Sequence, residues 1–177
     1  MTGKKIYAGI GARLTPPNVL DIMRFLADKL EDEGWLLRSG GASGADSAFE
    51  SGVKSYSNKC IYLPGPSFNG KTPGNGCFDS TTLPGWNHAL LTVDEFHPSP
   101  WMLSDFVRKL MARNALQVFG PTMERPADMI IAWTLNGEII GGTGQALRMA
   151  EGCGVTVHNL GNAETLENIF QILGLDI

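Results

Sequence analysis

The chain has 177 residues and a formal net charge of −4, and 43% of its residues are hydrophobic. This hydrophobic content excludes an intrinsically disordered chain. The mean hydropathy of −0.03, without any apolar run near the ~20 residues that span a bilayer, excludes a membrane protein. We therefore expect a single domain over residues 1–177, located in the cytoplasm and without a membrane partner.

The basic residues and the cysteines bear on which partners and which stabilising sites the chain has. Only 14 residues are Lys or Arg and none form a basic run, so nucleic acid is a possible partner but not the favoured one. The three cysteines are far apart, odd in number and without CxxC spacing, which fits neither a zinc site nor a disulfide framework. We expect no metal and no cofactor.

Strands and helices are predicted to alternate along the chain. Short apolar runs predict strands at 5–10, 35–38, 59–63, 129–133 and 155–159. Helical spacing or capping signals predict helices from about 16 to 33, 46 to 56, 101 to 119, 145 to 151 and 163 to 173. Five such units predict an α/β three-layer sandwich with a mainly parallel sheet of about five or more strands and helices on both faces.

Residues 64–100 interrupt this alternation. The segment is rich in glycine and proline and has no clear period, apart from a short helical piece at 83–93. Long loops of this kind are often lids or binding loops. We expect a long loop insertion that folds over a ligand site.

Three glycine-rich turns each follow a predicted strand, at 9–13, 39–46 and 141–144. The carboxyl ends of parallel strands meet at one edge of the sheet, where ligands bind. Glycine lets backbone approach a ligand, and the helix that follows offers free N–H groups to phosphate. The alternative is that strand-to-helix turns simply need glycine. The candidate phosphate ligands in and beside the turns are Gly9, Gly11, Arg13, Ser39, Gly40, Gly41, Ser43, Gly44, Gly141, Gly142, Thr143, Gly144 and Gln145.

The turns lack the commonest phosphate and nucleophile motifs. The first begins like GxGxxG but has Leu14 at the third glycine, and no Walker A lysine is present. The second has Ala45 where a nucleophile elbow needs its last glycine.

Two of the turns resemble sequence motifs of known protein families. Residues 39–46 resemble the "SGGARGID" signature of the Rossmann-like domain in the DNA-processing protein A (Smf) family, and Arg113-Asn114 resembles the start of its "RNR" segment. Residues 141–146 resemble its "SGS-x-x-TA" segment and the "PGGxGTxxE" motif of the Lonely-guy phosphoribohydrolases. These families belong to the SLOG superfamily. The resemblance implies a Rossmann-like domain, a nucleotide-type ligand and a homo-oligomer.

The chain departs from both families at functional positions. Arg148 stands where the phosphoribohydrolases have their catalytic glutamate, and Ala115 replaces the second arginine of "RNR". Asp46 and Glu50, four residues apart on one helix face, are the leading carboxylates that would replace the missing glutamate, with Asp94 and Glu95 as alternatives. Asp46 could instead bind a ribose or cap its own helix.

Three functions follow from these residues. The leading one is binding of a nucleotide or nucleotide-derived molecule, as a sensor, scavenger or modifier, with Arg113, Asn114 and Arg148 as further ligand contacts. The second is an enzyme, a hydrolase of the N-glycosidic bond of nucleoside monophosphates that uses Glu50 or Asp46. The third is a recombination mediator that binds single-stranded DNA, like DNA-processing protein A.

Overall fold

The computed structural model describes residues 3–176, and six parallel strands form its sheet in the order β4-β3-β2-β1-β5-β6. The pairing of β1 with β5 is the point where the strand order reverses, because β2 to β4 extend from one side of β1 and β5 and β6 from the other. The strands are β1 (Ile6–Gly11), β2 (Leu36–Ser39), β3 (Lys59–Leu63), β4 (Cys77–Asp79), β5 (Met129–Trp133) and β6 (Thr156–Asn159). The expected parallel α/β fold is confirmed.

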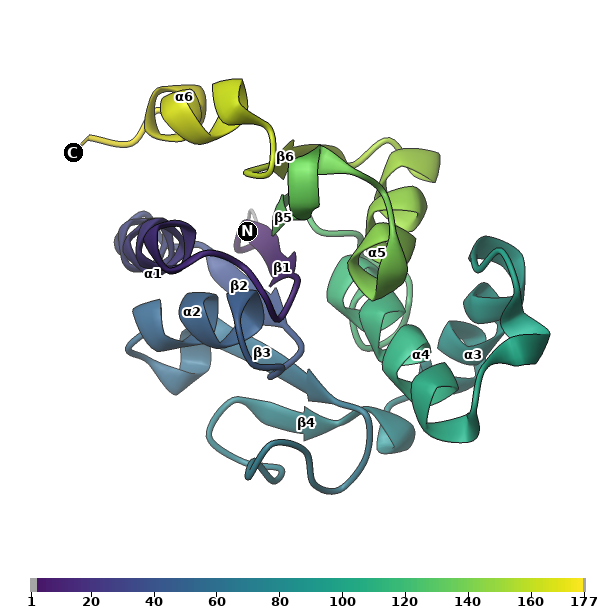
Figure 1. The fold of residues 1–177 in the computed structure, drawn as a ribbon. Coiled ribbons are helices and arrows are strands. Elements are labelled where there is room, and N and C mark those ends of the chain that lie inside the picture. The colour runs from purple at the N-terminus through teal and green to yellow at the C-terminus, as the bar shows by residue number, and fades with distance from the viewer. Residues whose placement is uncertain (1–2, 177) are drawn as a thin grey trace.

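Helices cover both faces of the sheet and make three layers (Figure 1). On one face lie α1 (Pro17–Asp32), α2 (Ala45–Gly52) and α6 (Ala163–Leu173), and on the other lie α3 (Trp86–Phe96), α4 (Asp105–Phe119) and α5 (Gly141–Gly152). Successive strand residues alternate between the two cores: Tyr7 packs in the first, and Ala8 and Ile10 pack in the second. The apolar run that predicted β1 is therefore buried on both sides, whereas the edge strand β6 is only partly buried.

The segment 64–100 has more regular structure than the expected loop insertion. It holds β4 and α3, and three-residue 3-10 helices precede α3 and α4. Because β4 has only three residues and lies at the edge of the sheet, it is too short to produce a recognisable strand pattern in the sequence. After this segment, α4 begins at Asp105 rather than at the predicted residue 101. Ser104 caps the helix by accepting a hydrogen bond from the Val107 N–H.

Helix α2 also ends earlier than expected, at Gly52. A Cβ built on Gly52 would lie 2.2 Å from the carbonyl oxygen of Arg24, so α1 and α2 cross at this glycine. No helix within residues 3–176 combines the length and the apolar content that crossing a bilayer requires.

Candidate functional site

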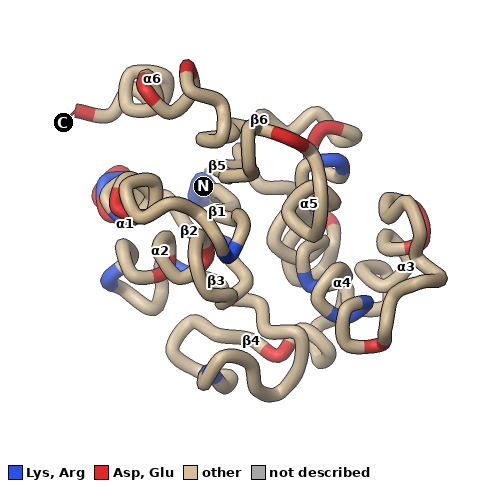
Figure 2. Tube along the Cα trace, in the orientation of Figure 1, with Lys and Arg blue, Asp and Glu red and all other residues tan. Residues whose placement is uncertain are grey.

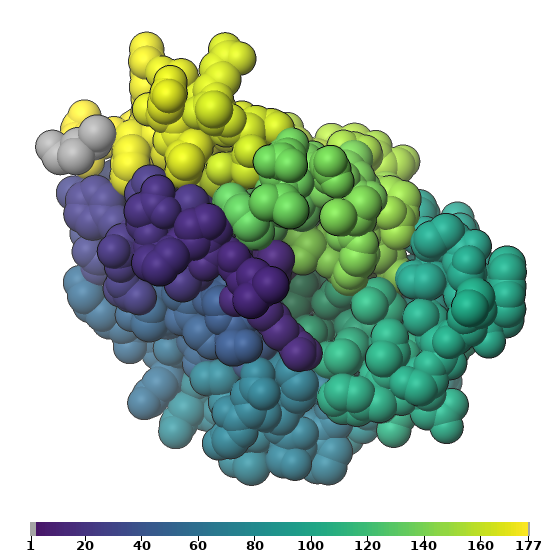
Figure 3. All heavy atoms as spheres, in the orientation of Figure 1, coloured from purple at the N-terminus to yellow at the C-terminus, as the bar shows by residue number. Residues whose placement is uncertain are grey.

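A cavity of about 420 Å³ opens at the carboxyl edge of the sheet, where β1 and β5 lie side by side. Its walls come from the turn after β1, the start of α2, the middle of α4, and the segment between β5 and α5. Figure 3 shows the space-filling surface on this side, where the purple start of the chain, the green β5–α5 segment and the teal α4 segment approach one another. The volume falls in the lower part of the range for small-molecule sites.

The turn after β1 reaches the cavity through Gly11 and Arg13, but Gly9 does not. A Cβ on Gly9 would lie 2.5 Å from the Phe49 ring, and one on Gly11 would lie 2.6 Å from the Ala45 side chain. Both glycines therefore let α2 pack closely on β1. Arg13 is exposed at the mouth of the cavity.

This packing role of Gly9 can be tested by Gly9→Val. Because the Phe49 ring would have to move, we expect the substitution to lower the free energy of unfolding by about 1–3 kcal/mol, measured by urea denaturation. The control is Gly65→Val, since a Cβ on Gly65 meets no atom within 4 Å. Equal stability of the two variants would contradict the assigned role of Gly9.

The turn after β2 is held mainly by the protein itself. The Ser39 hydroxyl donates to the Gly9 carbonyl at 2.6 Å, and the Asn69 amide donates to the Gly41 carbonyl at 3.1 Å. Gly41 has a positive φ of 68°, which glycine adopts without strain. The structure places Ser43 at the surface, and of residues 39–46 only Ala42 and Asp46 line the cavity.

Asp46 and Arg113 form a buried ion pair in the cavity wall. Their side chains are 5% and 6% exposed, and the Arg113 Nη1 lies 3.7 Å from the Asp46 Oδ2. The same nitrogen donates to the carbonyls of Gly40 and Tyr62. The ring of Phe68 lies over the guanidinium, 5.7 Å away. Arg113 therefore joins α4 to the turn after β2.

Burial dominates the electrostatics of this pair. It raises the pKa of Asp46 to about 6, although Arg113 and nearby backbone N–H groups, that of Ala42 first, act to lower it. Burial also lowers the pKa of Arg113, and Asp46 partly offsets this. An arginine keeps its charge in proteins, so Asp46 is the member of the pair that titrates.

Gly141, Gly142 and Thr143, which the sequence predicted as part of a turn, form the first turn of α5 and line the cavity. Among residues 3–176 no side chain caps α5, so the N–H groups of its first turn are available to a ligand. The Asn114 amide donates to the Gly142 carbonyl at 3.0 Å and fixes the turn against α4.

The next residues of α5 have supporting roles. A Cβ on Gly144 would lie 2.6 Å from the Ile139 backbone, and the buried Gln145 amide donates to the Met111 carbonyl at 3.4 Å. Arg148 donates to the carbonyls of Phe96 and Ile139. None of the three lines the cavity.

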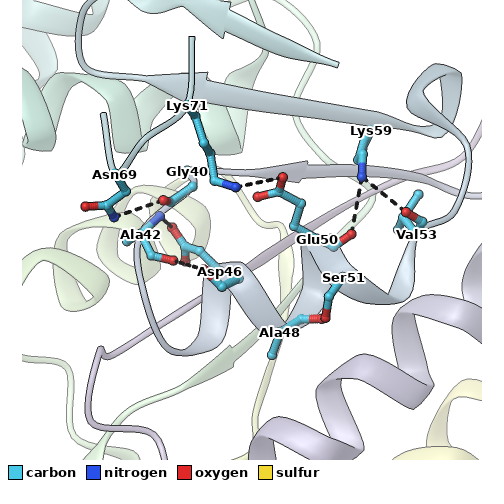
Figure 4. Close-up of polar contacts among 12 residues, drawn as sticks. Gly40, Ala42, Asp46, Ala48, Glu50, Ser51, Val53, Lys59, Asn69 and Lys71 are labelled. Atoms are coloured by element: carbon cyan, nitrogen blue, oxygen red, sulfur yellow. Dashed lines mark hydrogen bonds and ion pairs between the residues drawn. The ribbon is translucent and has the colours of Figure 1, made fainter. Parts of the chain in front are cut away.

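The two candidate catalytic carboxylates point in different directions (Figure 4). Glu50 does not line the cavity and pairs with Lys71 at 3.0 Å. Lys71 belongs to the segment before β4, and no sequence pattern marks it as a partner of α2. Asp46 is the only acidic residue in the cavity wall among residues 3–176. Within the same residues, no three His, Cys, Asp or Glu side chains gather as metal ligands would.

Sequence reasoning missed several residues of the wall. They are Leu110, Met111 and Gln117 on α4, together with Thr134, Leu135 and Ile140 between β5 and α5. Thr134 directly follows β5 and could have been found from its position at the carboxyl end of that strand. Leu110 and Met111 carry no such signal, because apolar helix positions normally indicate core, and nothing in the sequence pattern marks Gln117.

Comparison with known proteins adds a structural relative. No family model matches the chain, and no curated protein matches it. A solved structure of DNA processing protein A from Helicobacter pylori, reported for its single-stranded DNA binding mode, is similar with a TM-score of 0.57. The two chains are 19% identical, and the match covers 98% of this chain and 74% of the other. The chain therefore has the Rossmann-like fold of DNA processing protein A, as the resemblance of its glycine-rich turns implied.

Proposed function

We propose that the cavity binds a nucleotide-type small molecule of about the size of a nucleoside monophosphate. The observation that carries the proposal is the meeting of two glycine-containing turns and the uncapped start of α5 around one cavity at the β1–β5 edge. Open α/β sheets bind nucleotides at this position. A cavity of about 420 Å³ is small for a dinucleotide.

The wall divides into parts that suit different parts of a nucleotide. Arg13 and the first turn of α5 suit a phosphate, because both offer positive potential and N–H donors. Leu110, Leu135 and Ile140 give an apolar stretch that suits a base. The side chains of Leu135 and Ile140 are exposed and therefore accessible to a ligand at the mouth of the cavity.

Binding is favoured over hydrolysis because of the carboxylates. Glycosidic hydrolysis commonly uses two carboxylates on either side of the bond. Asp46 lines the cavity, whereas Glu50 pairs with Lys71 outside it. The pKa of Asp46, about 6, would suit proton transfer near neutral pH, so hydrolysis remains the second candidate.

Single-stranded DNA is the third candidate, because the structural relative binds it. A strand needs a track of positive charge along several phosphates. The chain carries a net charge of −4, and Figure 2 shows basic and acidic positions interspersed along the visible elements. We therefore rank a small ligand above DNA.

The proposal can be tested by calorimetric titration with AMP, GMP, CMP and UMP, with a short single-stranded oligonucleotide for comparison. We expect one monophosphate to bind and to raise the melting temperature by about 5 °C at saturation. Chromatography of the recovered ligand then separates binding from hydrolysis. No binding of any monophosphate, or binding of the oligonucleotide alone, would contradict the proposal.

A substitution that places a charge at the mouth of the cavity tests where the ligand binds. Leu135→Glu should weaken binding of that monophosphate about tenfold or more, because it puts a hydrated carboxylate into the apolar wall assigned to the base and adds a negative charge to the mouth that the anionic ligand enters. Leu91→Glu on α3 makes the same change at a residue that is 65% exposed and outside the cavity. It should leave the affinity unchanged. Equal effects of the two variants would mean that the ligand binds elsewhere.

A further inference from the structure

We infer that the cavity selects ribonucleotides over 2′-deoxyribonucleotides, because the Asp46 carboxylate accepts hydrogen bonds from the hydroxyls of the sugar. The inference rests on the proposed function and specifies its ligand class. It starts from the position of Asp46, the only acidic side chain in the cavity wall among residues 3–176.

The carboxylate is held in place before any ligand arrives. Its Oδ2 accepts a hydrogen bond from the Ala42 N–H at 3.3 Å and lies 3.7 Å from the Arg113 Nη1. An ionised carboxylate has about four acceptor positions. The N–H groups of Gly40 and Gly11 also lie close enough to lower the pKa of the carboxylate. Within residues 3–176 only the Ala42 N–H meets hydrogen-bond geometry, so acceptor capacity remains for a group that enters the cavity.

Charge decides which part of a nucleotide reaches Asp46. A phosphate beside a buried carboxylate would place two negative charges together, which is costly. The phosphate is favoured instead at Arg13 and at the uncapped N–H groups of Gly142 and Thr143. The base is favoured on the apolar side chains of the mouth. The sugar joins the two, and its hydroxyls are the donors that can meet the carboxylate.

This contact would discriminate between sugars. A hydrogen bond to a charged group contributes more than a neutral one, and a ligand without the hydroxyl leaves one acceptor position of the buried carboxylate desolvated and without a donor. A site built to bind a hydroxyl therefore rejects the analogue that lacks it. The charged group that faces Asp46 is Arg113 on α4. Arg13, at the turn after β1, acts on Arg113 and lowers the pKa of its guanidinium.

The test compares matched ligands at pH 7.5, where Asp46 is ionised: AMP with dAMP, GMP with dGMP, and CMP with dCMP. For the pair that binds best, we expect the ribonucleotide to bind about 10- to 100-fold more tightly. Asp46→Asn should reduce this ratio to near one, mainly by weakening the ribonucleotide. Equal affinities for both sugars in the unmodified protein would overturn the inference and leave the proposed function intact. Binding of neither sugar would overturn both.

A control variant distinguishes direct contact of Asp46 with the ligand from support of the turn after β2 by Asp46. The Ser47 hydroxyl donates to the Ala42 carbonyl at 2.7 Å, so it supports the same turn as Asp46, but it does not line the cavity. Ser47→Ala should therefore keep the ribose preference. If Ser47→Ala abolished the preference as Asp46→Asn does, Asp46 would be acting through the turn and the inference would fail. The comparison in the unmodified protein decides the sugar preference even if a variant does not fold.

Discussion

Replacing Arg113 with methionine is expected to lower the free energy of unfolding by about 3–5 kcal/mol, because it removes one partner of a buried ion pair. The loss leaves Asp46 buried without its countercharge and leaves the carbonyls of Gly40 and Tyr62 without their donor. A domain of this kind has about 5–15 kcal/mol of stability in total, so the loss should be large in urea denaturation.

The double variant Asp46→Leu with Arg113→Met gives the matching control. Replacing both partners of a buried pair by apolar side chains is often neutral or stabilising, so the double variant should recover much of the loss. Arg148→Met is a second control, because Arg148 also donates to two backbone carbonyls but is less buried and pairs with no carboxylate in the described part of the chain. It should cost about 1 kcal/mol. A loss below 1 kcal/mol for Arg113→Met would contradict the buried pair.

The sequence predicted the fold through the order of its elements and the position of its glycines. Short apolar runs predicted five of the six strands, and the glycine-rich segments at 9–13 and 141–144 do meet at one cavity. Glycine marks these turns because backbone conformation and close packing leave no room for a side chain. This constraint is local, and local constraints can be read from a sequence.

The sequence could not predict which of the glycines face a ligand and which face the protein. Gly9 packs on Phe49, and Gly40 lies beneath Arg113, 73 residues away along the chain. Such contacts depend on how α2 and α4 pack on the sheet. The divergence of Asp46 and Glu50 has the same origin, because the ion pair of Glu50 with Lys71 depends on where the segment before β4 folds.

Helical spacing placed Asp46 and Glu50 on one face of α2, but it could not decide their environments. Asp46 lies at the first turn of the helix, beside the cavity, and Glu50 lies one turn further on, beside the segment that carries Lys71. Asp46 therefore becomes a buried group with a pKa of about 6 that pairs with Arg113, whereas Glu50 pairs with Lys71 outside the cavity. The difference in chemistry comes from tertiary packing rather than from sequence spacing.

The titration of Asp46 should make the protein more stable as the pH falls from about 6 toward 4. Its pKa is about 6 in the folded state, against a value of 3.8 for the exposed side chain. Between these values the folded state binds the proton and the unfolded state does not, so stability falls as the pH rises. The difference between the two values corresponds to about 3 kcal/mol at most. Above pH 6 the stabilisation is lost, because Asp46 is then ionised in both states.

Asp46→Asn isolates this contribution, since asparagine does not titrate. Other groups act in the opposite direction: hydrogen bonds from the Lys54 and Ser55 N–H groups and from Asn58 lower the pKa of Glu31, so acid removes the stability that Glu31 provides. Because Glu31 is present in both proteins, its effect cancels in the difference. We expect the stability of the unmodified protein, minus that of Asp46→Asn, to fall by up to about 3 kcal/mol between pH 4 and pH 7.5 in urea denaturation. A difference that stays flat or rises with pH would mean that Asp46 is not the buried titrating group of the cavity.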